Sequence, residues 1–313
     1  MRPSSLTPTP RTVAALALAA ASWGIGTVIS KRATAEIPPL TLLAIQLTAS
    51  LVLLVVLMRW RRLPFRDPSA SPLLGRLGLL NPGLSYALSL LGLTYITASL
   101  SVLLWAMEPV LILFLAGWLL HERITAGLVV LSLVAVAGML IVIQQPDSEG
   151  DLIGVGLTLA GVACCAIYTV AARRWLGAAD STSQVLVAQQ VHALALAAVL
   201  VGGAWLVNGA ILPAEVSAAG WLSAIVSGVL YYGVAYWLYL SGLRQVPASL
   251  AAVSFYLIPV FGVAAGFVLL GERLEPAQWL GVVIVLGAIA LIVRRNAAMG
   301  IEEAVDRPVP VEA

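Results

Sequence analysis

One carboxylate interrupts a long apolar segment in the first half of the chain. Of the 15 acidic residues, Glu108 alone lies in the middle of a predicted membrane span. A charged side chain at that depth costs about 2.5–3.5 kcal/mol on insertion scales, so it normally faces a cavity or a partner. Glu108 could take up and release a proton, or it could bind the ammonium group of an amino acid. The alternative is a protonated structural carboxyl that is hydrogen-bonded to a neighbouring helix.

Aromatic and hydroxyl side chains recur at helical spacing around this carboxylate and in other apolar segments. Ser101, Trp105 and Glu108 follow i, i+4, i+7 spacing and share one helix face. The full predicted lining of a central cavity is Glu108, Trp105, Ser101, Trp23, Thr27, Tyr86, Tyr168, Tyr232, Tyr236 and Phe255. Such a lining suits amphipathic solutes, and aromatic faces attract cations. The alternative is that aromatic residues anchor the spans at the membrane interface, which is strongest for tryptophans near span ends.

The chain that carries these side chains is too apolar to make a water-facing surface. Hydrophobic residues make up 61% of its 313 residues, charged residues make up 10%, and mean hydropathy is +1.00. Backbone groups in lipid must bond within their own segment, so each span is predicted to be helical. The predicted fold class is therefore an all-α integral membrane protein with ten transmembrane helices. The predicted helices are Thr12–Lys31, Pro39–Met58, Leu73–Leu93, Thr97–Leu120, Ile124–Ile143, Leu152–Ala172, Ser183–Leu206, Trp221–Ser241, Pro247–Leu270 and Ala277–Val293.

The distribution of Lys and Arg predicts the orientation of these helices. If the N-terminus is cytoplasmic, only Lys31, Arg32 and Arg273 of the 17 basic residues lie on the outer side. Cytoplasmic loops carry the excess of Lys and Arg, so both termini are predicted to be cytoplasmic. We expect a multi-pass protein of a bacterial inner membrane. The net charge of +2, with basic residues at span ends, argues against a nucleic-acid partner.

An internal repeat divides the chain into two halves. At a shift of 150 residues, Thr97-Ala98-Ser99 aligns with Pro247-Ala248-Ser249, and Tyr86 aligns with Tyr236. At a shift of 142, the run that begins Ser22-Trp23 aligns with the run that begins Cys164-Cys165. Each half holds five predicted helices, and an odd number makes the halves cross the membrane in opposite senses. Inverted repeats of this kind are typical of secondary transporters, whose site lies near the midplane.

The repeated motifs resemble those of a known family. Two P–x(12)–E-R patterns, Pro109 with Glu122-Arg123 and Pro259 with Glu272-Arg273, occur in register with the two-times-five layout and with Trp23 early in the first span. In these features the chain resembles the EamA-type transporters of the drug/metabolite transporter superfamily. The resemblance implies a central cavity enclosed by helices 1, 3, 4, 6, 8 and 9. It also implies efflux of amino acids, their metabolites or other small organic solutes.

The predicted organisation follows from the repeat. It consists of a cytoplasmic N-terminal tail (1–11), a first repeat (12–145), a second repeat (152–295) and a disordered cytoplasmic tail (296–313). Pro109 and Pro259 lie inside spans, where proline kinks a helix. They could act as hinges, or they could impose fixed curvature that packs the bundle. We interpret the two Glu-Arg pairs as local ion pairs. Gln46, Gln189, Gln190 and His192 are interpreted as interhelical hydrogen-bonding residues of peripheral helices.

Several functional alternatives stay open at this point. The leading hypothesis is an exporter that is either driven by the proton motive force or moves its substrate down a gradient by facilitated diffusion. An importer is a further possibility. The main alternative from another class is a non-transporting component, such as a lipid-handling partner of an envelope enzyme. An intramembrane enzyme would need a second catalytic group near Glu108, so we predict no catalytic residue. No Walker A, HExxH or metal-ligand cluster occurs in the sequence, and we expect no cofactor or metal. The expected partners are a small-molecule substrate, lipid and protons, and the expected state is a monomer or weak homodimer.

Overall fold

The computed structural model describes residues 10–62, 72–108, 110–112, 115, 126–143, 151–175, 182–243 and 257–305. All the regular structure within these ranges is helical. The first half contains α1 (Pro10–Ala33), α2 (Pro39–Trp60), α3 (Pro72–Arg76), η1 (Leu77–Leu79), η2 (Leu80–Leu84), α4 (Ser85–Tyr95), α5 (Ala98–Trp105) and α7 (Ala126–Ile143). The second contains α8 (Asp151–Trp175), α9 (Thr182–Asn208), α10 (Ala218–Gly228), η3 (Val229–Val234), α11 (Ala235–Leu243), α13 (Leu257–Ala265), η5 (Gly266–Leu270) and α14 (Pro276–Val305).

The helices have the length and composition of a multi-pass membrane protein. Six helical segments are long and apolar enough to cross a bilayer: Pro10–Ala33, Pro39–Trp60, Pro72–Tyr95, Leu152–Ala171, Ser183–Val207 and Ala218–Tyr239. Four shorter apolar helices are Ala98–Ile112, Val129–Gly138, Leu257–Leu270 and Pro276–Ala288. All of these segments overlap spans predicted from the sequence. Large apolar side chains such as Val52, Leu133 and Val199 are exposed on the outside of the bundle, as a lipid-facing surface requires.

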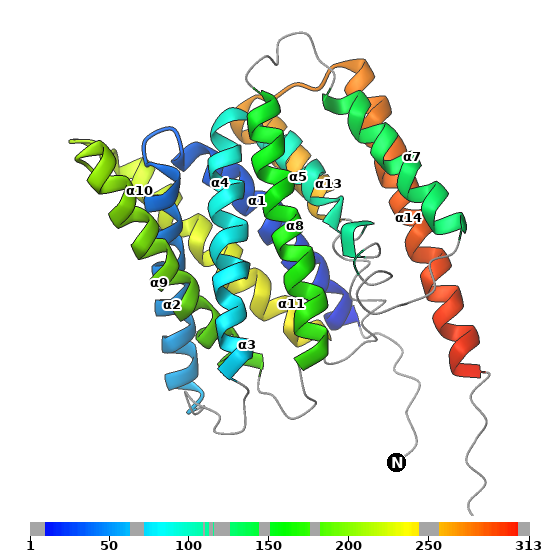
Figure 1. The fold of residues 1–313 in the computed structure, drawn as a ribbon, viewed down its shortest axis with the longest axis horizontal. Coiled ribbons are helices and arrows are strands. Elements are labelled where there is room, and N and C mark those ends of the chain that lie inside the picture. The colour runs from blue at the N-terminus through cyan, green and yellow to red at the C-terminus, as the bar shows by residue number, and fades with distance from the viewer. Residues whose placement is uncertain are drawn as a thin grey trace, which may run out of the picture.

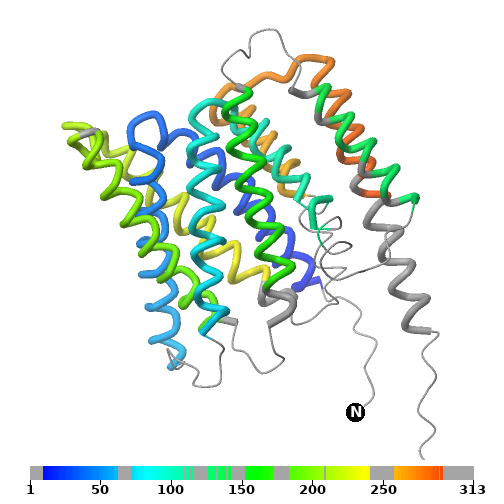
Figure 2. The backbone as a smooth tube through the Cα atoms, in the orientation of Figure 1, coloured from blue at the N-terminus to red at the C-terminus, as the bar shows by residue number. Residues whose placement is uncertain are grey.

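Helices of the two halves pack against each other in matching pairs. Helix α4 packs on α8, while α1 packs on α10 and α11. Helix α1 also packs on α13, and α5 packs on α8. In Figure 1, α7 and α14 lie side by side at one edge of the bundle, and α2 and α9 lie side by side at the other. Figure 2 shows the same arrangement, in which α1, α4, α5, α8 and α13 occupy the middle of the bundle.

Two of the expected spans depart from regular α-helix part of the way along their length. The predicted span Leu73–Leu93 is kinked at η2, where Asn81 has the non-helical angles φ −143° and ψ 120°. The physical reason is Pro82, which has no N–H to donate and disfavours helical angles in the residue before it. The predicted span Trp221–Ser241 contains the π-helical turn η3. These two irregular segments occupy equivalent positions of the repeat.

Glycines at two equivalent positions let helices approach very closely. A Cβ placed on Gly228 of α10 would lie 2.5 Å from Gln46 Cα and 2.6 Å from Gln46 O on α2. A Cβ placed on Gly78 of η1 would overlap the backbone of Gln189 on α9. Because a shift of 150 relates the two glycines and a shift of 143 relates the two glutamines, the same crossing occurs twice, each time between a helix of one half and a helix of the other.

Two predictions about the ends of spans need revision. Glu272 was expected to form a local ion pair with Arg273, but its carboxylate instead accepts hydrogen bonds from Ala98 and Ser99 at the start of α5. Arg273 donates to the carbonyl oxygen of Phe267 and lies over the Phe267 ring. The tail was expected to begin at residue 296, whereas α14 continues to Val305. Residues 297–303 include Ala, Met and Glu, which favour helix.

Candidate functional site

Glu108 has polar partners on a helix of the other half. The thiol of Cys165 on α8 donates to Glu108 Oε1, with Sγ and Oε1 3.3 Å apart. The side chain of Thr169, one helical turn further along α8, also hydrogen-bonds to this carboxyl. Glu108 is partly exposed, and no basic side chain contacts it within the described residues. The carboxyl therefore belongs to a polar group of side chains that retains some accessible surface.

Tyr86 on α4 is the centre of an aromatic cluster beside this polar group. Its ring stacks on Trp105, with ring centroids 5.2 Å apart and an interplanar angle of 16°. Its edges meet the rings of Tyr231 at 5.2 Å and Tyr232 at 5.1 Å, both nearly perpendicular. Trp105, which stacks on Tyr86, lies three residues before Glu108 in the same segment. The cluster and the carboxyl therefore form one neighbourhood.

The aromatic cluster joins the two halves of the chain. The hydroxyl oxygens of Tyr86 and Tyr236, which are equivalent in the repeat, lie 3.3 Å apart at hydrogen-bonding distance. Trp23 on α1 meets the ring of Tyr236 edge-on at 5.3 Å. The side chains of Thr27 and Tyr231 are also hydrogen-bonded to each other. Side chains from α1, α4 and the Ala98–Ile112 segment in the first half thus meet side chains from η3 and α11 in the second.

Irregular backbone positions the tyrosines in this cluster. Tyr231 and Tyr232 belong to the π-helical turn η3, and Tyr236 follows it in α11. A π-helical turn adds a residue to the turn and so changes the direction of the side chains that follow. Tyr86 lies just after the kink at Asn81. Single-turn π segments often occur at functional sites, which agrees with their position here.

The glutamines in the flanking helices tie the central helices together. Gln46 on α2 donates to Ser30 Oγ at 2.8 Å and to Ser227 Oγ at 2.7 Å, so it joins α1 to α10. Gln189 on α9 accepts from the hydroxyl of Tyr168 at 3.0 Å and donates to the carbonyl of Leu74 at 3.1 Å.

Gln190 likewise donates to the carbonyl oxygen of Tyr232, which confirms the interhelical interpretation for all three glutamines. That interpretation is wrong for His192, whose Nδ1 pairs with the Ala188 carbonyl oxygen of its own helix. The Ala188 carbonyl oxygen lies one helical turn earlier on the same helix, 2.8 Å from the ring nitrogen. The imidazole of His192 is therefore bonded within α9.

The predicted site residues differ in how accessible they are. Trp105, Glu108, Tyr168 and Tyr236 are partly exposed. Trp23, Thr27, Tyr86, Ser101 and Tyr232 are buried, and Tyr232 is only 2% exposed. Pro259 is buried in α13. Phe255 and Pro109 lie outside the described residues.

The structure adds residues that the sequence did not single out. Cys165 was not among the predicted site residues, yet its thiol contacts Glu108. Thr169 and Tyr231 also belong to the site. The repeat contained a signal for Cys165, because it aligns with Trp23, which was among the predicted site residues. Ser85 donates to the Gly161 carbonyl oxygen at 2.8 Å, where α4 packs on α8.

A bundle of apolar helices with a polar and aromatic centre defines a membrane transport protein, and comparisons with known proteins identify its family. The EamA-like transporter family matches the chain twice, at residues 11–144 and 152–294. The chain therefore belongs to the EamA family of the drug/metabolite transporter superfamily. The two matches also mean that one family unit occurs twice in this chain.

Similar proteins extend over almost the full length of the chain. A protein of Archaeoglobus fulgidus named "Uncharacterized transporter" is 25% identical over 284 residues, which cover 90% of this chain and 98% of that protein. The "Uncharacterized transporter YvbV" of Bacillus subtilis is 27% identical over 308 residues, covering 95% and 97%. A solved crystal structure matches with a TM-score of 0.63 at 19% identity, covering 91% of this chain and 99% of the other, and so shares the fold.

Proposed function

We propose that this protein is a secondary transporter that exports small organic solutes, such as amino acids, related metabolites or drugs, across a bacterial inner membrane. Ten transmembrane helices form two inverted halves, both termini are cytoplasmic, and the halves alternate access around a central site. The observation that carries this proposal is that Tyr86 and Tyr236, one from each half, meet through their hydroxyls, and that Tyr86 stacks on Trp105, three residues before Glu108.

Matching contacts between the halves support a two-fold relation. The α4–α8 contact corresponds to the contact of α1 with α10 and α11, and the α1–α13 contact corresponds to α5–α8. The close approach of Gly228 to Gln46 corresponds to that of Gly78 to Gln189. Two units of similar shape that share such an interface can rock against each other without separating, which is the motion that alternating access needs.

The two sides of the site differ in polarity, which favours an amphipathic solute. In the repeat, Glu108 aligns with Ile258 and Cys165 aligns with Trp23. The polar contact between Glu108 and Cys165 therefore corresponds to an apolar cluster that contains Ile258 and Trp23. A solute could place its polar group beside Glu108 and its apolar body against the aromatic side.

Charge favours a solute that carries an amino or quaternary ammonium group. All 17 Lys and Arg residues lie at or beyond the ends of the predicted spans, and none of those that the structure describes contacts Glu108. An anionic solute would have no basic partner at this depth. A cation could pair with the carboxylate and contact the faces of Trp105 or Tyr231.

Hinges for alternating access are proposed at proline and at irregular turns. Pro259 lies within α13, and Pro109 occupies the equivalent position of the repeat. The kink at Asn81 and the turn η3 are further places where a helix can bend, because their backbone hydrogen-bonding pattern is already interrupted.

Transport of benzyltrimethylammonium, a permanently charged aromatic cation, tests this function in sidedness-controlled proteoliposomes. The wild-type protein should move the probe out through its predicted outer face, and an imposed pH gradient should drive the movement if protons are coupled. Glu108→Gln should remove that response, whereas the matched control Glu215→Gln, in an exposed loop, should keep it.

Each contrary result has a separate meaning. Movement of the probe by Glu108→Gln that still follows the pH gradient would exclude Glu108 as the coupling site. Wild-type movement that ignores the gradient would favour facilitated diffusion. A wild-type protein that moves neither this cation nor its zwitterionic analogue phenylalanine would refute the proposed function for aromatic solutes.

A further inference from the structure

Two carboxylates tie the halves together at one end of the bundle. Glu272, in the second half between η5 and α14, accepts from the backbone N–H groups of Ala98 and Ser99 at the start of α5 in the first half. Its Oε1 lies 2.8 Å from Ala98 N, and its Oε2 lies 2.9 Å from Ser99 N. The Ser99 hydroxyl also donates to Oε2, at 2.6 Å. One carboxylate thus bonds to three donors of the opposite half.

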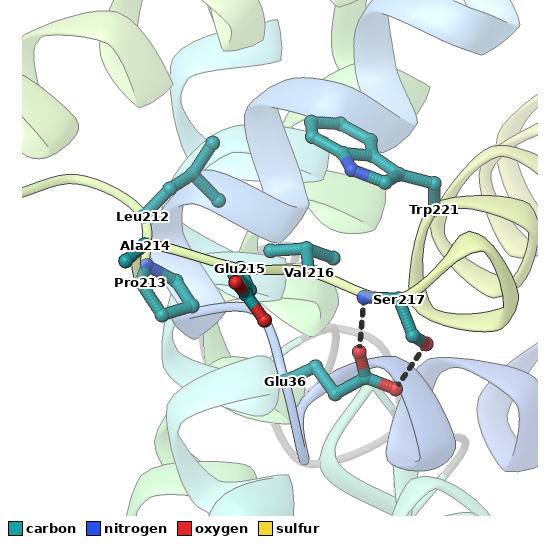
Figure 3. Close-up of a pocket in the computed structure, with 8 residues that line it drawn as sticks. All are labelled: Glu36, Leu212, Pro213, Ala214, Glu215, Val216, Ser217 and Trp221. Carbon is teal, nitrogen blue, oxygen red and sulfur yellow. Dashed lines mark hydrogen bonds between the residues drawn. The ribbon is translucent and has the colours of Figure 1, made fainter.

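Glu36 makes the reverse connection, from the first half to the second. It lies between α1 and α2, and its Oε2 accepts from Ser217 N at 2.7 Å, just before α10. Its Oε1 accepts from the Ser217 hydroxyl at 2.8 Å. Figure 3 shows both bonds. They lie beside a hollow of about 730 Å³ whose lining includes Trp221. The bonds from the Ser217 backbone and hydroxyl lower the pKa of Glu36, and Arg32 adds a smaller effect in the same direction.

Both carboxylates occupy helix N-termini, where backbone N–H groups lack intrahelical partners and the helix dipole favours a negative charge. In both places a glycine leaves room for the carboxylate. A Cβ on Gly266 would lie 2.7 Å from Glu272 Oε2, and a Cβ on Gly220 would lie 2.8 Å from Glu36 Oε2. In both contacts, therefore, a carboxylate of one half binds a helix N-terminus of the other half beside a glycine: Glu272 binds the first half, and Glu36 binds the second.

The two contacts lie at the same end of the bundle. Lys31 at the end of α1 donates to the carbonyl oxygen of Leu93 near the end of α4, at 2.7 Å. This bond places the loop that carries Glu36 at the same end as the start of α5, where Glu272 binds. The Lys and Arg distribution assigns this end to the outside of the cell.

We propose that Glu272 and Glu36 are gating residues that hold the outer end of the transport path closed, which rests on the alternating access proposed above. Movement of the two halves apart at this end requires both carboxylates to leave their helix N-termini. Water can replace the lost hydrogen bonds on both the carboxylates and the amides, so the net cost of opening is modest. A contact of this kind can close the path firmly and still open reversibly.

The native thiol at the site provides the reporter for a test. Cys164 and Cys165 are the only cysteines in the chain, so a Cys164→Ser background leaves one thiol, next to Glu108. A membrane-impermeant maleimide, applied to the outside of right-side-out vesicles, should label Cys165 slowly in this background. Combining Glu36→Ala with Glu272→Ala should raise the outside labelling rate by about ten-fold, because even a small free-energy change shifts the populations of open and closed states.

Matched variants separate gating from folding. Glu275→Ala removes an exposed carboxylate from the loop of Glu272, and Glu215→Ala removes one from the loop of Ser217, the partner of Glu36; both should leave the labelling rate unchanged. Gly266→Ala keeps Glu272 in the chain but displaces its carboxylate, so it should also raise outside labelling. Thermal stability is measured for each protein, because a purely structural contact would lower stability without changing the side from which Cys165 is labelled.

Two results would overturn the proposal in distinguishable ways. If Cys165 in the background protein is labelled from the inner face, while outside labelling does not rise in the gate variants or rises equally in the controls, the gate is refuted and the transport path stands. If Cys165 is protected from both faces in every variant, the proposed transport path fails and the gate fails with it.

Discussion

Gly228→Ala tests how closely the helices of the two halves must approach. The added Cβ would lie 2.5 Å from Gln46 Cα, whereas ordinary contacts begin at 3.4 Å. The helices α10 and α2 must therefore separate by roughly 0.9 Å if they are not to overlap. The same movement would stretch the Gln46–Ser227 hydrogen bond from its 2.7 Å. Its length would become about 3.6 Å, which is beyond hydrogen-bonding distance.

The expected cost follows from three contributions. Overpacking costs about 1–3 kcal/mol, a lost interhelical hydrogen bond costs about 0.6 kcal/mol, and Ala in place of Gly in a helix returns about 1 kcal/mol. We therefore expect the free energy of unfolding of Gly228→Ala to fall by about 0.6–2.6 kcal/mol. Gly78→Ala, which would meet the backbone of Gln189 at the equivalent crossing, should lose a similar amount.

The assay is denaturant unfolding of the purified protein in detergent, followed by tryptophan fluorescence. Gly202→Ala on α9 is the matched control, because a Cβ there meets nothing within 4 Å. It should be neutral or slightly more stable than the wild type. If Gly228→Ala proves as stable as Gly202→Ala, the close approach of α10 to α2 is not what packs this part of the bundle.

Two further predictions concern hydrogen bonds that join the halves. Gln46→Leu removes the hydrogen bonds to Ser30 and Ser227. At about 0.6 kcal/mol for each bond, the unfolding free energy should fall by about 1 kcal/mol, because both serine hydroxyls keep a backbone acceptor. A loss above about 3 kcal/mol would contradict this reasoning. The lowered pKa of Glu36 means that its bonds to Ser217 contribute stability above the ordinary glutamate pKa and are lost as pH falls through the lowered value. A carbon-13 NMR titration of the Glu36 carboxyl measures its pKa directly. A midpoint at or above the ordinary glutamate pKa would contradict this prediction.

The sequence predicted the fold in outline because its main signals are local. Apolar segments of span length, with Pro and Gly between them, placed the helices, and six of them are long enough to cross a bilayer. The kink at Asn81 was not predicted, although Asn81-Pro82-Gly83 contained the signal for it. The high hydropathy of the segment predicted an uninterrupted helix. Proline disrupts helical backbone angles and hydrogen bonding even in an apolar segment, and this effect was not taken into account.

The candidate site could be predicted only in part, because most of its contacts join distant positions. Helical spacing grouped Trp105 with Glu108, and the repeat related Tyr86 to Tyr236, whose hydroxyls meet. The contact of Glu108 with Cys165 could not be read from spacing, since it depends on how α8 packs against another segment. The same holds for Glu272 and the start of α5, which are more than 170 residues apart in the sequence.

The central claim is that solutes bind beside Glu108 and the tyrosine cluster, and calorimetric binding of benzyltrimethylammonium tests it most directly. Replacing a charged acceptor by a neutral one loses about 1.4 kcal/mol of binding free energy. Glu108→Gln should therefore weaken binding of the cation about ten-fold. Glu215→Gln should bind the probe as the wild type does, and uncharged benzyl alcohol should bind wild type and Glu108→Gln alike. Equal affinity of wild type and Glu108→Gln for the cation would contradict the account.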